Sequence, residues 1–222
     1  MTIVKLILVA IISYLLGSLN FGVILSTRIK HDDVRSHGSG NAGSTNMLRN
    51  YGKAFAVLTI IGDMAKVGIA ILIAFLMIKE KELTGYKLFG DNATIMLKSF
   101  AGFFCVIGHI YPCFFKFKGG KGVATSGGMV FLVDWRIALI LLAMFIITVA
   151  VTQYVSLGSI LMAIFYPIYT FAFYLSIPLT VIALVFSVIV IVKHKENIVN
   201  LLEHKENKIT FKKKEKKHKF KH

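Results

Sequence analysis

Cysteine is nearly absent from this chain of 222 residues, which has only Cys105 and Cys113. Two cysteines in an apolar neighbourhood, with no second pair, exclude a disulfide framework and are typical of free, buried thiols. Charge is also scarce: 17% of the residues are charged, against about 25% in soluble globular proteins. The 56% share of hydrophobic residues and the mean hydropathy of +0.72 exclude a soluble enzyme with a single core and a disordered chain. The composition therefore predicts an integral membrane protein.

Apolar runs of membrane length divide the chain. A helix needs about 20 apolar residues to cross a bilayer core of about 30 Å. The first run has no small-residue cleavage site, so it is interpreted as a membrane helix and not as a signal peptide. We expect an all-α bundle of seven transmembrane helices, at residues 3–25, 54–78, 93–111, 123–133, 137–151, 157–175 and 178–192.

Positive charge predicts the orientation of these helices. Residues 26–53 hold five Lys or Arg, residues 113–121 hold three, and the chain from Lys193 onward holds eleven. With seven spans these segments share one side of the membrane, and the positive-inside rule makes that side the cytoplasm. The N-terminus is then outside and the C-terminus cytoplasmic. We divide the chain into a membrane domain, 1–209, and a basic cytoplasmic tail, 210–222, whose low complexity is typical of a solvated end.

The first basic loop contains the glycine-rich sequence GSGNAGSTNMLR at 38–49. Its spelling matches the dinucleotide fingerprint, but no strand precedes it and apolar runs flank it, so that interpretation is rejected. Glycines permit positive φ and let backbone N–H groups converge on an anion. Arg49 can bind an oxyanion with two hydrogen bonds, and further donors or helix caps come from Ser39, Ser44, Thr45 and Asn46. From these residues alone, a phosphate cradle and a flexible turn remain equal alternatives.

The second basic loop, FKGGKGVAT at 117–125, repeats this pattern without meeting the Walker A spacing. It places Lys118 and Lys121 beside exposed backbone donors at an expected helix start. If the loop were basic only because it lies in the cytoplasm, the lysines would be explained but not the glycines at 119, 120 and 122. His109, just upstream, is expected to be structural.

Three pairs of polar residues lie within or beside the apolar runs. Ser156 and Ser159 share one helical face, where small residues also favour plain helix packing. His194 and Asn197 have the same spacing at the end of the last run, where a lone histidine is usually a surface residue. Asp63 and Lys66 lie inside the second run and are expected to pair and shape the bundle. No Cys/His ligand cluster is present, so neither a metal nor a cofactor is expected.

Four segments in this order resemble one family, the bacterial acyl-phosphate:glycerol-3-phosphate acyltransferases (PlsY). They are GSGNAGSTNMLR at 38–49, GHIYPCFFKFKGGKGVAT at 108–125, YVSLGS at 154–159 and HKENI at 194–198, and the resemblance extends to about Ile209. It implies a seven-span enzyme of the bacterial cell membrane with its site facing the cytoplasm. The implied reaction moves a fatty acyl group from acyl phosphate to the 1-hydroxyl of glycerol 3-phosphate. Lysophosphatidate and phosphate are the products of this early step of phospholipid synthesis.

The resemblance also implies a role for each candidate residue. Acyl phosphate would be bound by Ser39, Gly40, Asn41, Gly43, Thr45 and Asn46. Glycerol 3-phosphate would be bound by Arg49, Lys121 and Ser159, with Lys118 and Ser156 as lesser candidates. His194 and Asn197 would position or deprotonate the attacking hydroxyl; both roles stay open for His194, because the departing phosphate can take the proton. Structural support would come from His109, Gly119, Gly120, Gly122, Asp63 and Lys66.

The chain departs from the family pattern in its C-terminal part. Val199 and Asn200 stand where an arginine is usual, His204 where a glycine is common, and Gln153 where an arginine is common. As for partners, the resemblance implies membrane lipid, no nucleic acid, and functional coupling to the enzyme that forms acyl phosphate.

The rival function is a transporter or channel for phosphorylated small molecules, which would use the same spans and basic loops. An odd number of helices without an internal repeat, and both glycine-rich loops on one face, disfavour a transporter. A non-catalytic membrane anchor would leave the glycine-rich loops unexplained.

Overall fold

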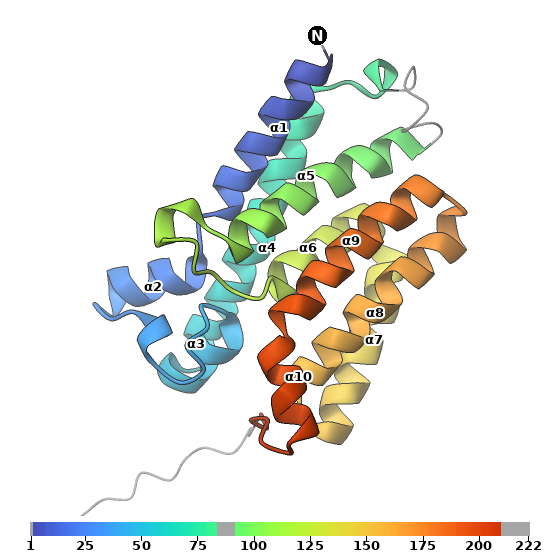
Figure 1. The fold of residues 1–222 in the computed structure, drawn as a ribbon. Helices are drawn as coiled ribbons and strands as arrows, with labels where there is room; N and C mark the ends of the chain where they lie inside the picture. The colour runs from blue at the N-terminus through green and yellow to red at the C-terminus, as the bar shows by residue number, and fades with distance from the viewer. Residues whose placement is uncertain (1, 84–91, 210–222) are drawn as a thin grey trace, which may run out of the picture.

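The computed structural model describes residues 2–83 and 92–209 and contains only helices and loops within them, as predicted (Figure 1). The helices are α1 (Thr2–Gly17), α2 (Phe21–Ile29), α3 (Ser44–Tyr51), α4 (Lys53–Met77), α5 (Ala93–Ile110), α6 (Val123–Val133), α7 (Trp135–Thr152), α8 (Val155–Tyr174), α9 (Ile177–Lys193) and α10 (Lys195–Leu202). Short 3-10 turns lie at Val34–Ser36, Glu80–Glu82 and Cys113–Phe115. The tail at 210–222, which the sequence sets apart, lies outside the described residues.

Helix length and composition support a membrane bundle. Within the described residues, α4, α5, α7 and α8 are long and apolar enough to cross a membrane. Two bent pairs, α1–α2 at 40° and α9–α10 at 59°, would bring the spans to six. The seventh expected span coincides with α6, whose 11 residues reach only about 16 Å at 1.5 Å per residue. The count of seven therefore stays a prediction.

The first apolar run forms two helices, α1 and α2, so the expectation of one continuous helix over 3–25 is wrong. Asn20 caps α2, its side-chain oxygen accepting from the N–H of Val23 at 3.3 Å. The Lys66 ammonium donates to the carbonyl oxygens of Gly17 at 2.9 Å and Leu19 at 3.0 Å. A buried cation thus satisfies carbonyls that a continuous helix would have paired, and the break becomes stable.

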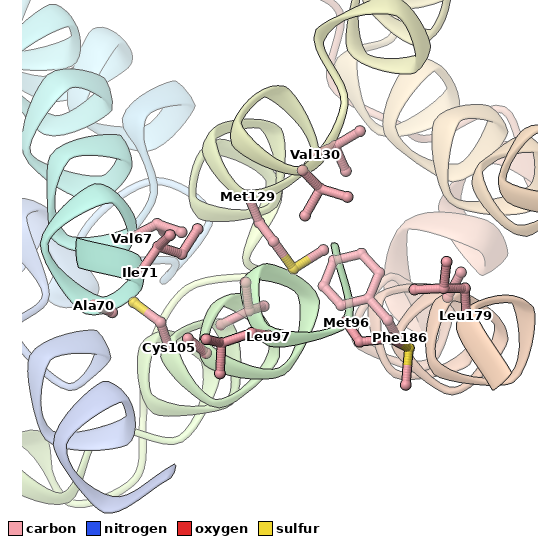
Figure 2. Close-up of a cluster of buried hydrophobic side chains, with 14 of the residues drawn as sticks. Val67, Ala70, Ile71, Met96, Leu97, Cys105, Met129, Val130, Leu179 and Phe186 are labelled. Atoms are coloured by element: carbon pink, nitrogen blue, oxygen red, sulfur yellow. The ribbon is translucent and has the colours of Figure 1, made fainter. Parts of the chain in front are cut away.

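The core lies between helices that are distant in sequence. Figure 2 shows Val67 and Ile71 of α4, Cys105 of α5, Met129 of α6 and Phe186 of α9 among its side chains. The helix α1 packs closely against α5 and contributes Val9 to the same core. Both cysteines are free thiols as predicted, Cys105 buried and Cys113 half-buried.

The two ends of the bundle differ. The N-terminus of α1 lies at one end, while α2, α3 and α10 lie at the other (Figure 1). This second end also holds the glycine-rich loops and the end of the described chain, so it gathers the candidate residues.

Candidate active site

The first glycine-rich loop is folded around one buried amide. Gly38 and Gly40 have φ of 59° and 67°, the left-handed region that glycine permits, as the sequence predicts. Asn46 accepts from the N–H of Ser39 at 3.1 Å. Its side-chain nitrogen lies within hydrogen-bond distance of the carbonyl oxygens of Val34, His37 and Asn41, at 3.0, 2.9 and 2.9 Å. The Asn46 amide therefore holds the loop together, while the residue also lines the cavity described below; its expected contact with phosphate stays a prediction.

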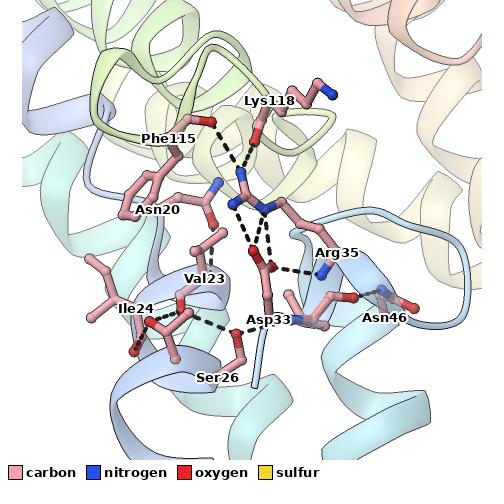
Figure 3. A network of polar contacts seen from close by, with 11 residues as sticks. Asn20, Val23, Ile24, Ser26, Asp33, Arg35, Asn46, Phe115 and Lys118 are labelled. Carbon is pink, nitrogen blue, oxygen red and sulfur yellow. Dashed lines mark hydrogen bonds and ion pairs between the residues drawn. The ribbon is translucent and has the colours of Figure 1, made fainter. Parts of the chain in front are cut away.

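Arg35 joins the two glycine-rich loops (Figure 3). Its guanidinium donates to the Asp33 carboxylate, at 2.7 Å from Nη2, and this hydrogen bond holds the pKa of Asp33 below its usual range. From Nη1 it donates to the carbonyl oxygens of Phe115 at 3.1 Å and Lys118 at 2.9 Å. Arg35 belongs to none of the motifs quoted above. In the sequence it is only a basic residue between the acidic pair Asp32–Asp33 and the glycines at 38 and 40.

The second loop rests on His109. The N–H of Gly120 donates to the His109 carbonyl at 3.2 Å, and a Cβ at Gly120 would lie 2.2 Å from His109 Nε2, so only glycine fits. His109 Nδ1 lies 3.0 Å from Lys66 Nζ, which is 2.9 Å from Asp63 Oδ1. The expected pairing of Asp63 with Lys66 is confirmed. Since an ammonium only donates, His109 Nδ1 accepts, and one buried cluster links the α1–α2 break to this loop.

These loops border a cavity of about 790 Å³ with a polar end and an apolar continuation. Its walls include most of the predicted site residues: Ser39, Asn41, Gly43, Thr45, Asn46, Arg49, Asp63, His109, Lys121, Gly122, Ser156, Ser159, His194 and Asn197. Away from them it runs between α4, α6, α7 and α8, lined by Ile60, Met64, Val130, Leu142, Phe145 and Ile146 among others. The cavity can hold a molecule with a charged head and an apolar tail.

Helix starts contribute to the polar end. No side chain among the described residues caps the first turn of α3, α6 or α8. Ser44 and Thr45, Val123 and Ala124, and Val155 and Ser156 from these first turns line the cavity. First-turn N–H groups and the helix dipole favour an anion. With Arg49 and Lys121 beside them, they suit a phosphate group.

Lys121 belongs to a hydrogen-bonded group at this end. It donates to the side-chain oxygen of Asn197. The Asn197 amide and the Ser156 hydroxyl both donate to Oε1 of Glu206, each at 2.8 Å. Burial lowers the pKa of Lys121, against the opposing effect of Glu206 and Glu196. Glu206 was missed by the sequence analysis because it follows the last recognisable segment.

His194 lies at the bend between α9 and α10, buried, and lines the cavity. Its Nδ1 lies 2.8 Å from the Val190 carbonyl oxygen, which can only accept, so Nδ1 carries the hydrogen. Burial lowers the pKa of His194 and favours the neutral ring. In that form Nε2 keeps a lone pair, so His194 is a hydrogen-bond acceptor.

Some predicted residues stand apart from the cavity. Gly40, Lys118 and Gly119 line a separate hollow of about 440 Å³, together with Arg35. The Lys118 side chain is exposed, and its carbonyl is bound by Arg35. Lys66 and Gly120 do not line the cavity, but both contact His109, which does. The structure therefore separates Gly40 and Lys118 from the group that shares the cavity.

Comparison with known proteins identifies the family of this chain. A family model described as glycerol-3-phosphate acyltransferase matches residues 7–204. The glycerol-3-phosphate acyltransferase of Bartonella henselae is 38% identical over 202 residues, covering 91% of this chain and 90% of the relative. That of Coxiella burnetii (strain CbuG_Q212) is 40% identical over 204 residues, covering 90% and 95%.

Two crystal structures of PlsY, an integral membrane glycerol 3-phosphate acyltransferase, have similar folds. The glycerol 3-phosphate form has a TM-score of 0.79 at 35% identity, covering 92% of this chain and 96% of that one. The lysophosphatidic acid form has a TM-score of 0.76 at 34% identity, covering 92% and 95%. By its sequence over nearly its whole length and by its membrane-helix fold, the chain belongs to the glycerol-3-phosphate acyltransferase family.

Proposed function

We propose that this protein transfers a fatty acyl group from acyl phosphate to the 1-hydroxyl of glycerol 3-phosphate, as an early step of phospholipid synthesis. The observation that carries the proposal is one cavity that is polar at one end, where helix starts lie beside Arg49 and Lys121, and apolar at the other. Both substrates carry a phosphate, and one also carries a hydrocarbon chain.

The donor is proposed to lie along the length of the cavity. Its phosphoryl group would be bound by the start of α3, with Ser39, Asn41 and Thr45 on the walls. Its acyl chain would lie against the apolar side chains of α4, α6 and α7. Acyl phosphate is a mixed anhydride and already activated, so the protein has to position it and to bind the charge of the leaving phosphate.

The acceptor is proposed to bind at the same polar end, between α3 and the start of α8. Arg49 and Lys121 would pair with its phosphate, and Ser156 and Ser159, from the start of α8, would add hydroxyl groups. The Nε2 lone pair of His194 would accept a hydrogen bond from the 1-hydroxyl and direct its oxygen toward the donor.

The proposed step balances without another reactant. The hydroxyl oxygen bonds to the acyl carbonyl carbon, the bond from that carbon to the phosphate oxygen breaks, and the hydroxyl proton leaves with the phosphate. The products are lysophosphatidate and inorganic phosphate. The polar end is proposed to face the cytoplasm of a bacterial cell, because the basic loops at 26–53 and 113–121 lie beside it. Functional coupling to the enzyme that forms acyl phosphate fits this placement.

Phosphate release by the purified protein tests the proposal. Palmitoyl phosphate with glycerol 3-phosphate should release phosphate and form lysophosphatidate, while palmitoyl phosphate with glycerol should release little. If the folded protein forms no lysophosphatidate in several detergents and in vesicles, the proposed function is refuted. For the orientation, Cys113→Ser variants with Lys79→Cys or Lys118→Cys can be treated with an impermeant thiol reagent in intact cells. Labelling at 79 alone is expected, and labelling at 118 alone would overturn the orientation.

A further inference from the structure

Residues 203–209, which follow α10, cross the polar end of the cavity. The segment leaves α10 through His204, whose φ of 57° turns the chain. Beyond that turn, the carbonyl of Asn207 accepts from Arg49 Nη2 at 3.3 Å, and the N–H of Ile209 donates to the carbonyl of Gln153 at 2.9 Å. The segment is therefore fastened to α3 and to the end of α7, and Glu206, Asn207 and Ile209 line the cavity.

Glu206 places a carboxylate among the groups proposed for the acceptor. Its Oε1 accepts from Ser156 and from Asn197 at 2.8 Å each, and Asn197 in turn accepts from Lys121. With Arg49 held by Asn207, this one segment bonds three side chains at the polar end directly and a fourth, Lys121, through Asn197.

We propose that residues 203–209 are a strap, in which the Glu206 carboxylate occupies the phosphate subsite for glycerol 3-phosphate until the substrate displaces it. The identity of the displaced ligand rests on the proposed function. Carboxylate and phosphate use the same donors, namely ammonium, amide and hydroxyl groups. Two anions sharing one small site repel each other, so the carboxylate leaves as the phosphate enters.

The strap makes the site selective for phosphorylated acceptors. A phosphate dianion has three oxygens and about two charges with which to replace one carboxylate. An uncharged polyol offers no charge to Lys121 and Arg49 and leaves the carboxylate in place. The apparent affinity for phosphate is lowered by the fraction of time that the strap is closed.

A structural role for Glu206 gives the opposite result. If the carboxylate only orders Ser156 and Asn197 for the substrate, its removal weakens phosphate binding. If it is a competitor, its removal strengthens phosphate binding. The direction of the change decides between the two.

The test is direct binding of inorganic phosphate, and separately of glycerol 3-phosphate, to purified full-length protein in neutral detergent. Glu206→Ala should bind both about 10-fold more tightly or better, as for a site that is open about a tenth of the time. Glu206→Gln keeps an acceptor oxygen without the charge and should show a smaller gain. Glu203→Ala is the matched control, because Glu203 pairs with Lys205 at the surface, at 2.8 Å, and should bind as the wild type does. Equal or weaker binding by folded Glu206→Ala would overturn the strap.

A second measurement uses the unaltered protein. Glycerol 3-phosphate or phosphate should speed cleavage by trypsin after Lys205 and Lys208, read by mass spectrometry, whereas slower or unchanged cleavage would count against displacement. These readouts do not need turnover. If Glu206→Ala binds phosphate more tightly but the unaltered protein transfers no acyl group, the strap is upheld and the proposed function is refuted. If the unaltered protein transfers the acyl group but Glu206→Ala binds phosphate no more tightly, the function is upheld and the strap is refuted.

Discussion

Arg35 Nη1 donates a hydrogen bond of 2.9 Å to the carbonyl oxygen of Lys118, which lies 83 positions later in the chain. The same guanidinium binds the Asp33 carboxylate through its other nitrogens. The two loops that border the polar end of the cavity therefore share one cation.

Arg35→Lys is expected to impair binding of both phosphate substrates. Lysine keeps the charge but cannot reach the carboxylate and two carbonyls at once. Losing charge-assisted hydrogen bonds of about 1.5–3 kcal/mol should lower kcat/KM roughly 10- to 150-fold. Steady-state kinetics measures this, with Arg28→Lys on the exposed side of α2 as control. If Arg35→Lys matched the wild type for both substrates, the loops would not depend on this link.

Arg49→Ala and Lys121→Ala should each lose most activity at nearly unchanged thermal stability. Each removes a cation proposed to bind phosphate, again roughly a 10- to 150-fold loss in kcat/KM. Exposed Lys53→Ala, at the start of α4, should keep wild-type kinetics. Near-normal kcat/KM in both site variants would refute the placement of the acceptor phosphate.

His194→Ala and His194→Gln should differ if His194 positions the hydroxyl. The amide oxygen of glutamine can stand near the Nε2 position and accept a hydrogen bond, but it has no useful basicity. We expect kcat of the alanine variant to fall much more than that of the glutamine variant, with little change in KM for either substrate. Equal losses of about 100- to 10,000-fold would instead identify His194 as the general base.

The lowered pKa of His194 sets the direction of the pH dependence. Because burial places this pKa below the ordinary 6.5, the ring is neutral at pH 7 and becomes charged only under more acidic conditions. Protonation removes the Nε2 lone pair, so kcat at saturating substrate should fall as the pH drops through a value below 6.5. The His194→Gln variant should lack this acid limb. An identical limb in both proteins would assign it to another group.

Lys66→Met should destabilise the bundle. It leaves Asp63 as a buried charge without its ammonium and frees the carbonyls of Gly17 and Leu19. Breaking a buried ion pair from one side costs about 3–5 kcal/mol. Thermal unfolding in detergent measures the loss, and Asp63→Asn combined with Lys66→Met should recover part of it. A melting temperature equal to the wild type in Lys66→Met would show that the cluster does not hold the α1–α2 break.

Much of the helical layout could be predicted from the sequence, because apolar run length and local breaks determine it. The expected segment 123–133 is α6 residue for residue. The break expected at Ser176 to Pro178 lies at Leu175 and Ser176, with Pro178 in the first turn of α9. The positive φ of Gly38 and Gly40 was also expected from the sequence, since it is a local property of glycine. That the glycine-rich loops bind anions stays a prediction. The pairing of Asp63 with Lys66 also followed from local spacing.

The tertiary structure decided what depends on contacts between distant residues. Whether residues 3–25 form one helix was settled by Lys66, more than 40 positions away, which binds the carbonyls at the break. That the Asn46 side chain lies beside three carbonyls of its own loop, those of Val34, His37 and Asn41, also became visible only in the folded chain. Glu206 carried no local signal at all, and it enters the site because the chain after α10 folds back over the start of α8. Side-chain hydrogen bonds depend on distance in space, and only the packed bundle determines which distant groups come within 3 Å of each other.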